Sequence, residues 1–166
     1  MTISLYSVSV PVFERMLRNL LAIIGKAEAN AAERKIKPEV LVGSRLAPDM
    51  YPLAFQVQSA TDRTKFFVAR VTGREAPSWA DNEQTLEELR ARIDKALAYL
   101  AGVKATDLDG NEDKPVSLKV RGEDVQQPAL DYLLLNVMPN FYFHVTTAYD
   151  ILRHNGVPLG KRDFVG

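Results

Sequence analysis

Apolar residues recur at helical spacing in four long stretches of the chain, residues 8–32, 48–71, 86–100 and 128–154. The stripe of the first stretch consists of Phe13, Leu17, Leu20, Ile24, Ala27 and Ala31. The second consists of Leu53, Val57, Ala60, Phe67, Val68 and Val71, and the third of Leu86, Leu89, Ile93, Leu97 and Leu100. Intervals of three and four place apolar side chains on one face of a helix, so the pattern predicts four amphipathic helices.

Residues at the ends of these stretches agree with the helical pattern. Ser9 is predicted to cap the first helix, and Gly73 to end the second. Thr85 followed three residues later by Glu88 has the spacing of a capping box at the start of the third helix. Pro139 removes a backbone hydrogen bond, so we expect the fourth helix to kink or restart there.

The segments between the helices are shorter or more polar. Residues 33–52 contain several prolines and are predicted to form a connection, whose cluster of Val40, Leu41 and Val42 closes one end of the core. Residues 116–127 alternate in polarity around Gly122, which predicts a small β-hairpin. The tail 156–166 is expected to pack back through Val157, Leu159 and Phe164.

Four helices with one apolar face each can bury those faces together. The sequence therefore predicts an all-α four-helix bundle with a small β-hairpin between the third and fourth helices. The chain has 166 residues, and we expect a single domain over residues 1–166. The long first link and the hairpin favour a topology other than plain up-down-up-down.

Composition narrows the classes of partner. Apolar residues make up 46% and charged residues 25%, as in soluble globular proteins. Lysine plus arginine equals aspartate plus glutamate at 21 each, so no net field favours nucleic acid or an anionic membrane as partner. The absence of cysteine excludes disulfides and thiolate metal sites. The first residues lack the pattern of a signal peptide, and we expect a cytoplasmic location.

Both histidines lie in the last predicted helix. His154 falls in the final turn, where a cation suits the helix dipole, and a capping or surface role is predicted. His144 falls on the flank of the apolar face, four residues after Asn140. The aromatic run 141–143 covers more than one helix face, so at least one ring should point away from the core.

A second polar residue is predicted to face the core. Gln56 lies on the apolar side of the second helix, whereas Gln58, Asp62 and Lys65 fall on the opposite side, which is expected to be solvated. A buried amide needs hydrogen-bond partners, and Asn140 and His144 are the available polar groups.

These residues predict a polar pocket, with two interpretations open. The pocket is lined by Gln56, Asn140 and His144, with Tyr149 or Tyr142 at its rim. Either it binds a ligand through His144, or it is a satisfied hydrogen-bond cluster that only sets helix register. His144 is the only plausible metal ligand, and amides bind zinc or nickel weakly, so no tightly held metal is expected.

Two long motifs resemble a known family. "RLAPDMYPLAFQVQSATD" (45–62) and "PNFYFHVTTAYDILRHNGVPLGKRDF" (139–164) are similar to a bacterial family of unknown function within the DinB/YfiT-like four-helix-bundle superfamily. The resemblance implies a DinB-like bundle that forms a homodimer. It also implies a divalent metal, such as zinc or nickel, held by one histidine on the second helix and an H-x-x-x-H pair on the last. Those positions correspond to Gln56, Asn140 and His144, of which only His144 is histidine.

Three functional hypotheses follow from the residues and the resemblance together. The first is a cytoplasmic homodimer whose core-end pocket binds a small molecule without a tightly held metal. The second is a divalent-metal-dependent transferase or hydrolase of the superfamily type. The third is a structural or interaction protein. Whether the chain is an enzyme is left open by the sequence.

Overall fold

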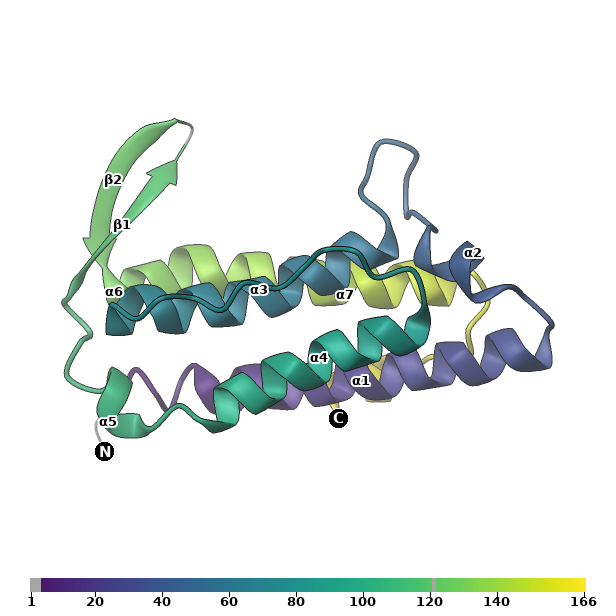
Figure 1. Ribbon diagram of the computed structural model, residues 1–166, viewed down its shortest axis with the longest axis horizontal. Coiled ribbons are helices and arrows are strands. Elements are labelled where there is room, and N and C mark those ends of the chain that lie inside the picture. Colours follow the sequence, from purple (N-terminus) through teal and green to yellow (C-terminus); the bar gives the residue numbers. More distant parts are fainter. Residues whose placement is uncertain (1–3, 121) are drawn as a thin grey trace.

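The long helices form two layers in the computed structural model, which describes residues 4–120 and 122–166 (Figure 1). Helix α1 (Val10–Glu33) packs along α4 (Leu86–Ala101), and α3 (Leu53–Thr72) packs along α7 (Met138–His154). Contacts of α3 with α4 and of α1 with α7 join the two layers. The predicted helical bundle with one small sheet is therefore confirmed.

Shorter elements connect the long helices. The helical ones are α2 (Pro38–Val42), α5 (Ala105–Leu108), α6 (Ala129–Asp131), the π-helix η1 (Tyr132–Val137) and α8 (Lys161–Val165). The strands are β1 (Pro115–Val120) and β2 (Glu123–Pro128), which pair antiparallel as the predicted hairpin, with Leu118 opposite Val125.

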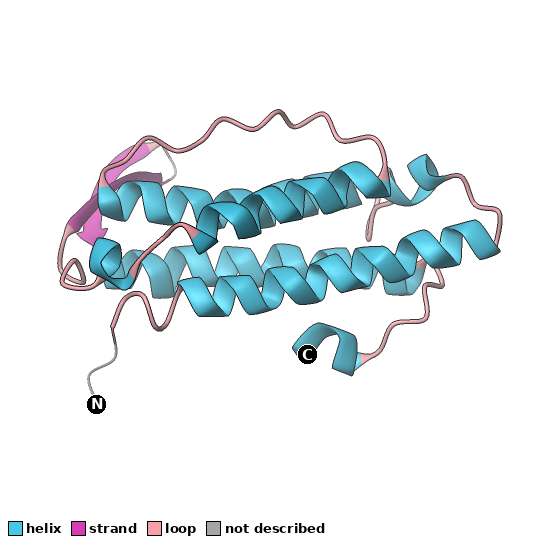
Figure 2. Cartoon of the chain, turned by 60° about the horizontal axis from the view of Figure 1, so that its bottom comes forward, coloured by secondary structure: helices cyan, strands magenta, loops and turns pink. Residues whose placement is uncertain are grey.

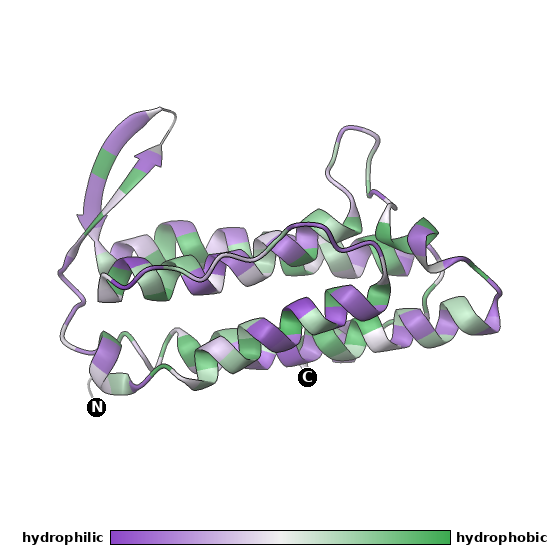
Figure 3. Cartoon of the chain, in the orientation of Figure 1, coloured by the Kyte–Doolittle hydropathy of each residue, from purple (hydrophilic) through white to green (hydrophobic). Residues whose placement is uncertain are grey.

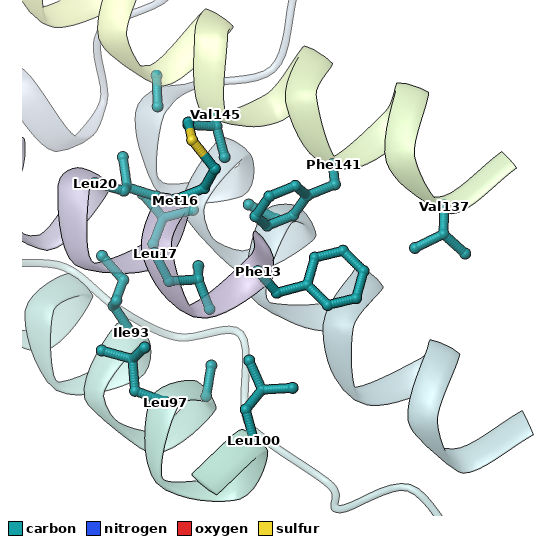
Figure 4. Close-up of a cluster of buried hydrophobic side chains, with 14 of the residues drawn as sticks. Phe13, Met16, Leu17, Leu20, Ile93, Leu97, Leu100, Val137, Phe141 and Val145 are labelled. Carbon is teal, nitrogen blue, oxygen red and sulfur yellow. The ribbon is translucent and has the colours of Figure 1, made fainter. Parts of the chain in front are cut away.

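The core lies between the layers and contains every residue of the three apolar stripes named above. Phe13 of α1 lies near its centre (Figure 4). Its ring meets those of Phe141 and Phe67 edge-on, with ring centroids 5.0 and 5.8 Å apart. Each such aromatic pair is worth about 0.5–1.5 kcal/mol beyond the area that it buries. Side chains from three of the four long helices thus meet at one aromatic centre.

The predicted helix ends were correct at α4 and wrong at α1. Thr85 and Glu88 form the full capping box, each side chain bonding the other's backbone N–H. Ser9 directly precedes α1, but its hydroxyl donates backward to the carbonyl of Leu5 at 2.6 Å and makes no cap bond. Helix α3 begins at Leu53 rather than at residue 48, because Pro52 is in an extended conformation.

The face of α3 expected to be solvated is covered. Lys65 is only 3% exposed, and Gln58 donates to the carboxylate of Glu83 at 2.8 Å. The cover is the extended segment 73–85, in which Trp79 lies under the Lys65 ammonium at 4.3 Å from the ring centroid. The prediction failed because a segment with no regular periodicity packs over these polar side chains.

The last helix contains a wider π turn just before Pro139 and does not break there. The π-helix η1 ends at Val137, and Pro139 then lies in the first turn of α7. Proline lacks the N–H that would bond the carbonyl four residues earlier, and a wider turn accommodates this loss. The interruption predicted at Pro139 is therefore a π turn within one nearly continuous helix.

Two segments rise from opposite ends of the α3–α7 pair, the hairpin at one end and the loop 43–52 at the other (Figure 1). Next to that loop, Leu41 and Val42 of α2 are buried as predicted, but Val40 is 54% exposed because it lies on the outer side of this single turn. The tail returns so that α8 packs on α1 (Figure 2), with Val157 and Leu159 buried.

Hydrophilic residues cover the outer sides of the helices and most of the hairpin (Figure 3). Within residues 4–120 and 122–166, no helix has the length and apolarity needed to cross a membrane.

Candidate functional site

The adjacent helices α3 and α7 bring two of the predicted pocket residues together. Nδ1 of His144 lies 2.8 Å from Oε1 of Gln56, and both side chains are buried. The amide of Gln56 is itself positioned, because its Nε2 donates to the carbonyl of Tyr51 at 2.9 Å. The contact expected between Gln56 and His144 is therefore present.

This chain of hydrogen bonds fixes the tautomer of His144. The carbonyl of Tyr51 can only accept, so Nε2 of Gln56 must face it, and Oε1 must face the imidazole. Oε1 also can only accept, and therefore Nδ1 of His144 carries the proton and donates. Nε2 of the neutral imidazole is left with a free lone pair.

That lone pair is unpaired within the described residues and is not fully buried. Nε2 of His144 has no hydrogen-bond partner within the described part of the chain, and it is not among the fully buried side-chain atoms that lack one. Aromatic rings border it, since Phe55 and Phe143 meet the imidazole edge-on with ring centroids at 6.1 and 5.4 Å. Tyr51 stacks on Phe55 at 4.1 Å. An acceptor nitrogen of a mostly buried imidazole is thus bordered by apolar rings.

His144 remains neutral over the physiological pH range. Burial lowers the pKa of its imidazole to about 4, and the positive charge of Arg63 acts in the same direction. A base of such low pKa is a weak proton acceptor at neutral pH, so the site suits hydrogen bonding better than general-base catalysis.

The other two predicted pocket residues are not in this hydrogen-bond chain. Asn140 lies one turn before His144, and its amide nitrogen donates to the carbonyl of Asn136 at 2.7 Å. Tyr149 lies on a different side of α7, where its ring meets Phe164 of α8 edge-on at 6.0 Å. His154 is exposed in the last turn of α7, as predicted. The rings of 141–143 divide as expected, with Phe141 buried and Phe143 56% exposed.

A family described as a domain of unknown function, DUF1993, matches residues 5–165. The chain belongs to the DUF1993 family. No curated protein matches the DUF1993 chain.

A solved structure supports the fold of the DUF1993 chain. It is the crystal structure of a DinB family member protein from Shewanella denitrificans, with 44% sequence identity and a TM-score of 0.88. The similarity covers 98% of this chain and 92% of that one. The predicted resemblance to DinB-like bundles is confirmed by these two findings.

The donor set of the DUF1993 chain does not fit the divalent metal that the DinB-like resemblance implies. Oxygen Oε1 of Gln56 is engaged by Nδ1–H of His144, and the amide of Asn140 is bonded within its own helix. Among residues 4–120 and 122–166, no three histidine, cysteine, aspartate or glutamate side chains are grouped to hold an ion. A single imidazole nitrogen is too few firm ligands for a catalytic zinc.

One residue near the site was missed by the sequence reasoning. Arg63 lies on α3 seven residues, or about two helical turns, after Gln56. Its charge reaches the imidazole of His144. The seven-residue spacing from Gln56 was the available signal, but arginines on helices are common and solvated, so the spacing alone does not identify a site.

Proposed function

We propose that this DUF1993 protein binds a small molecule beside His144, between α3 and α7, without a tightly held metal. The observation that supports this is the chain of hydrogen bonds from the Tyr51 carbonyl through Gln56 to His144, which orients Nε2 as an acceptor that is not fully buried. A ligand with an O–H or N–H group would donate to this nitrogen. The bordering rings of Phe55 and Phe143 would contact its apolar part.

This chain of hydrogen bonds has a feature that a merely structural cluster does not need. A cluster that only sets helix register is complete when its polar atoms are paired within the protein. Here both ends of the Gln56 amide are bonded, whereas Nε2 of His144 has no partner in the described residues and is not fully buried. The imidazole is therefore paired through Nδ1 and, among the described residues, unpaired at Nε2.

The test is a thermal-shift screen of a metabolite panel on wild type, His144→Ala and the matched control His154→Ala. We expect at least one compound to raise Tm of wild type and of the control, and to have no effect on His144→Ala. If every compound that shifts wild type also shifts His144→Ala equally, the proposal is wrong. A drop in Tm for His144→Ala with no ligand response in any protein would favour the structural or interaction role.

The metal-dependent alternative has one supporting observation. Histidines that bind metals commonly donate their second N–H to a carbonyl oxygen, as Nδ1 of His144 does to Gln56. Elemental analysis of untagged protein tests this directly. Near-stoichiometric zinc, nickel or iron that disappears in His144→Ala would favour a metal-dependent transferase or hydrolase and overturn the metal-free proposal.

The homodimer expected from the resemblance is part of the same proposal. Leu134, Leu135 and Phe143 of the η1–α7 helix are exposed and would supply an apolar contact surface. Light scattering coupled to size exclusion would give the mass of a dimer for wild type, and the mass of a monomer would contradict this part.

A further inference from the structure

A cavity of ≈ 400 Å³ lies between α3, η1 and the hairpin. Helix α3 contributes Arg63 and Arg70 to its lining, and η1 contributes Tyr132 and Asn136. The hairpin contributes the remaining residues, Ser117, Leu118, Lys119 and Asp124. A volume of this size holds one small molecule, since ligand sites typically measure about 300–1,000 Å³.

Positive charge predominates in this cavity although the whole chain is neutral. Among the described residues, three cations and one carboxylate line it, and that carboxylate, Asp124, lies opposite Lys119 in the hairpin register. Within the described residues, neither Arg63 nor Arg70 has a carboxylate within 4.0 Å. The two arginines therefore offer guanidinium groups that no acidic side chain of the described chain neutralises.

One of these arginines is held in place. A guanidinium nitrogen of Arg70 donates to the hydroxyl of Tyr132, whose ring is buried. The same guanidinium lies 5.5 Å from the ring centroids of Phe66 and Tyr132. Stacking and hydrogen bonding reduce the conformational freedom that an arginine loses when it binds a ligand.

We infer that this cavity binds the oxyanion group, phosphate or carboxylate, of a small organic molecule. Guanidinium groups match the geometry of both anions, and the Ser117 hydroxyl and the Asn136 amide add neutral donors. The inference rests on the proposed function, because it specifies the chemical class of the ligand that we propose to bind beside His144.

The cavity and the His144 site are connected through named residues. Arg63 lines the cavity, and its charge acts on His144. Asn136 lines the cavity, and its carbonyl accepts from Asn140, one turn before His144. A ligand whose oxyanion is bound in the cavity would extend past Arg63 toward Nε2 of His144.

Calorimetric titration with sodium phosphate and with sodium succinate, at constant ionic strength, tests the inference. We expect saturable binding of at least one anion to wild type and to the control Arg18→Gln, an exposed arginine of α1. Arg63→Gln and Arg70→Gln should each weaken it about tenfold or more. Phosphate alone would indicate a phosphorylated ligand, and succinate alone a carboxylate. Both outcomes support an oxyanion site.

The inference fails if neither anion binds saturably up to about 10 mM, or if all four proteins bind equally. Arg63→Gln is the safer variant, because Arg63 makes no hydrogen bond or ion pair with the described residues, whereas Arg70 also packs on Tyr132.

Titrating His144→Ala in parallel separates this inference from the proposed function. If a metabolite does not bind His144→Ala but binds both arginine variants as it binds wild type, the proposed function stands and the oxyanion site is wrong. If anion binding depends on the arginines and no ligand depends on His144, the oxyanion site stands and the proposed function is wrong.

Discussion

Arginines on two faces of the bundle have opposite surroundings. Arg92 of α4 is 1% exposed and lies against the face of α3 that the segment 73–85 covers. Arg63 and Arg70 line the cavity between α3, η1 and the hairpin and have no carboxylate partner within the described residues. The first arginine is fully used by the protein, and the other two are left with donors to spare.

Every part of the Arg92 guanidinium is engaged. Nε donates to the hydroxyl of Thr61 at 3.1 Å, and the terminal nitrogens meet Asp62 at 2.7 Å and Glu83 at 3.1 Å. The carbonyl of Ala80 accepts another bond, and the ring of Trp79 lies 5.1 Å away. A buried charge is tolerated only when it is paired in this way, so the network fastens the segment 73–85 to the bundle.

The difference separates structural charge from available charge. Donors that already have partners stabilise the fold and offer little to a ligand. Donors without partners contribute little to folding, and their pairing is left for a bound molecule. Mutation of Arg92 should therefore lower the stability of the protein, whereas mutation of Arg63 or Arg70 should weaken ligand binding in the cavity.

The largest expected effect on stability is that of Arg92→Ala. It removes the buried guanidinium and its bonds to Asp62 and Glu83, which keep only Lys65 and Gln58 as partners, and should lower the free energy of unfolding by about 3 kcal/mol. Urea denaturation followed by circular dichroism measures this. Arg90→Ala, which breaks an exposed pair with Glu28, is the control and should cost about 0–1 kcal/mol. Similar losses for both variants would contradict the comparison.

Gln56→Leu should have the next largest effect. It leaves Nδ1–H of His144 buried without an acceptor, at a cost of about 1–3 kcal/mol. The double variant with His144→Phe should recover part of that loss, because both members of the polar pair are then apolar. A double-mutant cycle by urea denaturation gives the coupling energy, and a value near zero would show that the bond does not link α3 to α7.

Protonation of His144 should make the stability of the protein depend on pH between pH 6.5 and 4. The pKa of His144 is about 4 in the folded protein, below its ordinary value of 6.5, so the unfolded chain binds more protons in this window. Stability therefore falls as the pH falls from 6.5 toward 4, and this group contributes no slope above 6.5. Denaturation of His144→Gln at several pH values should show a smaller slope than that of wild type in this window. Equal slopes in wild type and His144→Gln would contradict the shift.

The smallest effect on stability is expected for Arg63→Gln. Arg63 makes no ion pair in the described residues, so the free energy of unfolding should change by about 0.5 kcal/mol or less in either direction. Urea denaturation measures this alongside the anion titration of the same variant. A loss above about 2 kcal/mol would assign Arg63 to the structural group together with Arg92.

Much of the fold could be predicted because the bundle depends on apolar periodicity. The stripes that begin at Phe13, Leu53 and Leu86 are buried along their whole length, and the box at Thr85 depends on local spacing alone. The meeting of Gln56 with His144 was also predictable, since an amide among apolar positions must find a partner.

The regions that could not be predicted depend on contacts without periodicity. Arg92 lies between Leu89 and Ile93 in the best helical pattern of the chain, yet an apolar stripe gives no information on a charged residue within it. Its partners come from α3 and from a segment without regular structure, so no local pattern connects them. The cavity of Arg63 and Arg70 likewise forms only when the hairpin folds over α3.

The π turn before Pro139 also affects the register of the helix. A π turn contains one residue more than the corresponding α-helical stretch, so deleting the exposed Leu135 could restore an ordinary helix. Because the wider turn takes up that residue locally, the deletion would leave the residues before it facing as they do relative to α7. Tyr132 would keep its place beside Arg70, and His144 its place beside Gln56. The π turn thus accommodates one extra residue while both ends of the helix keep their register with α3.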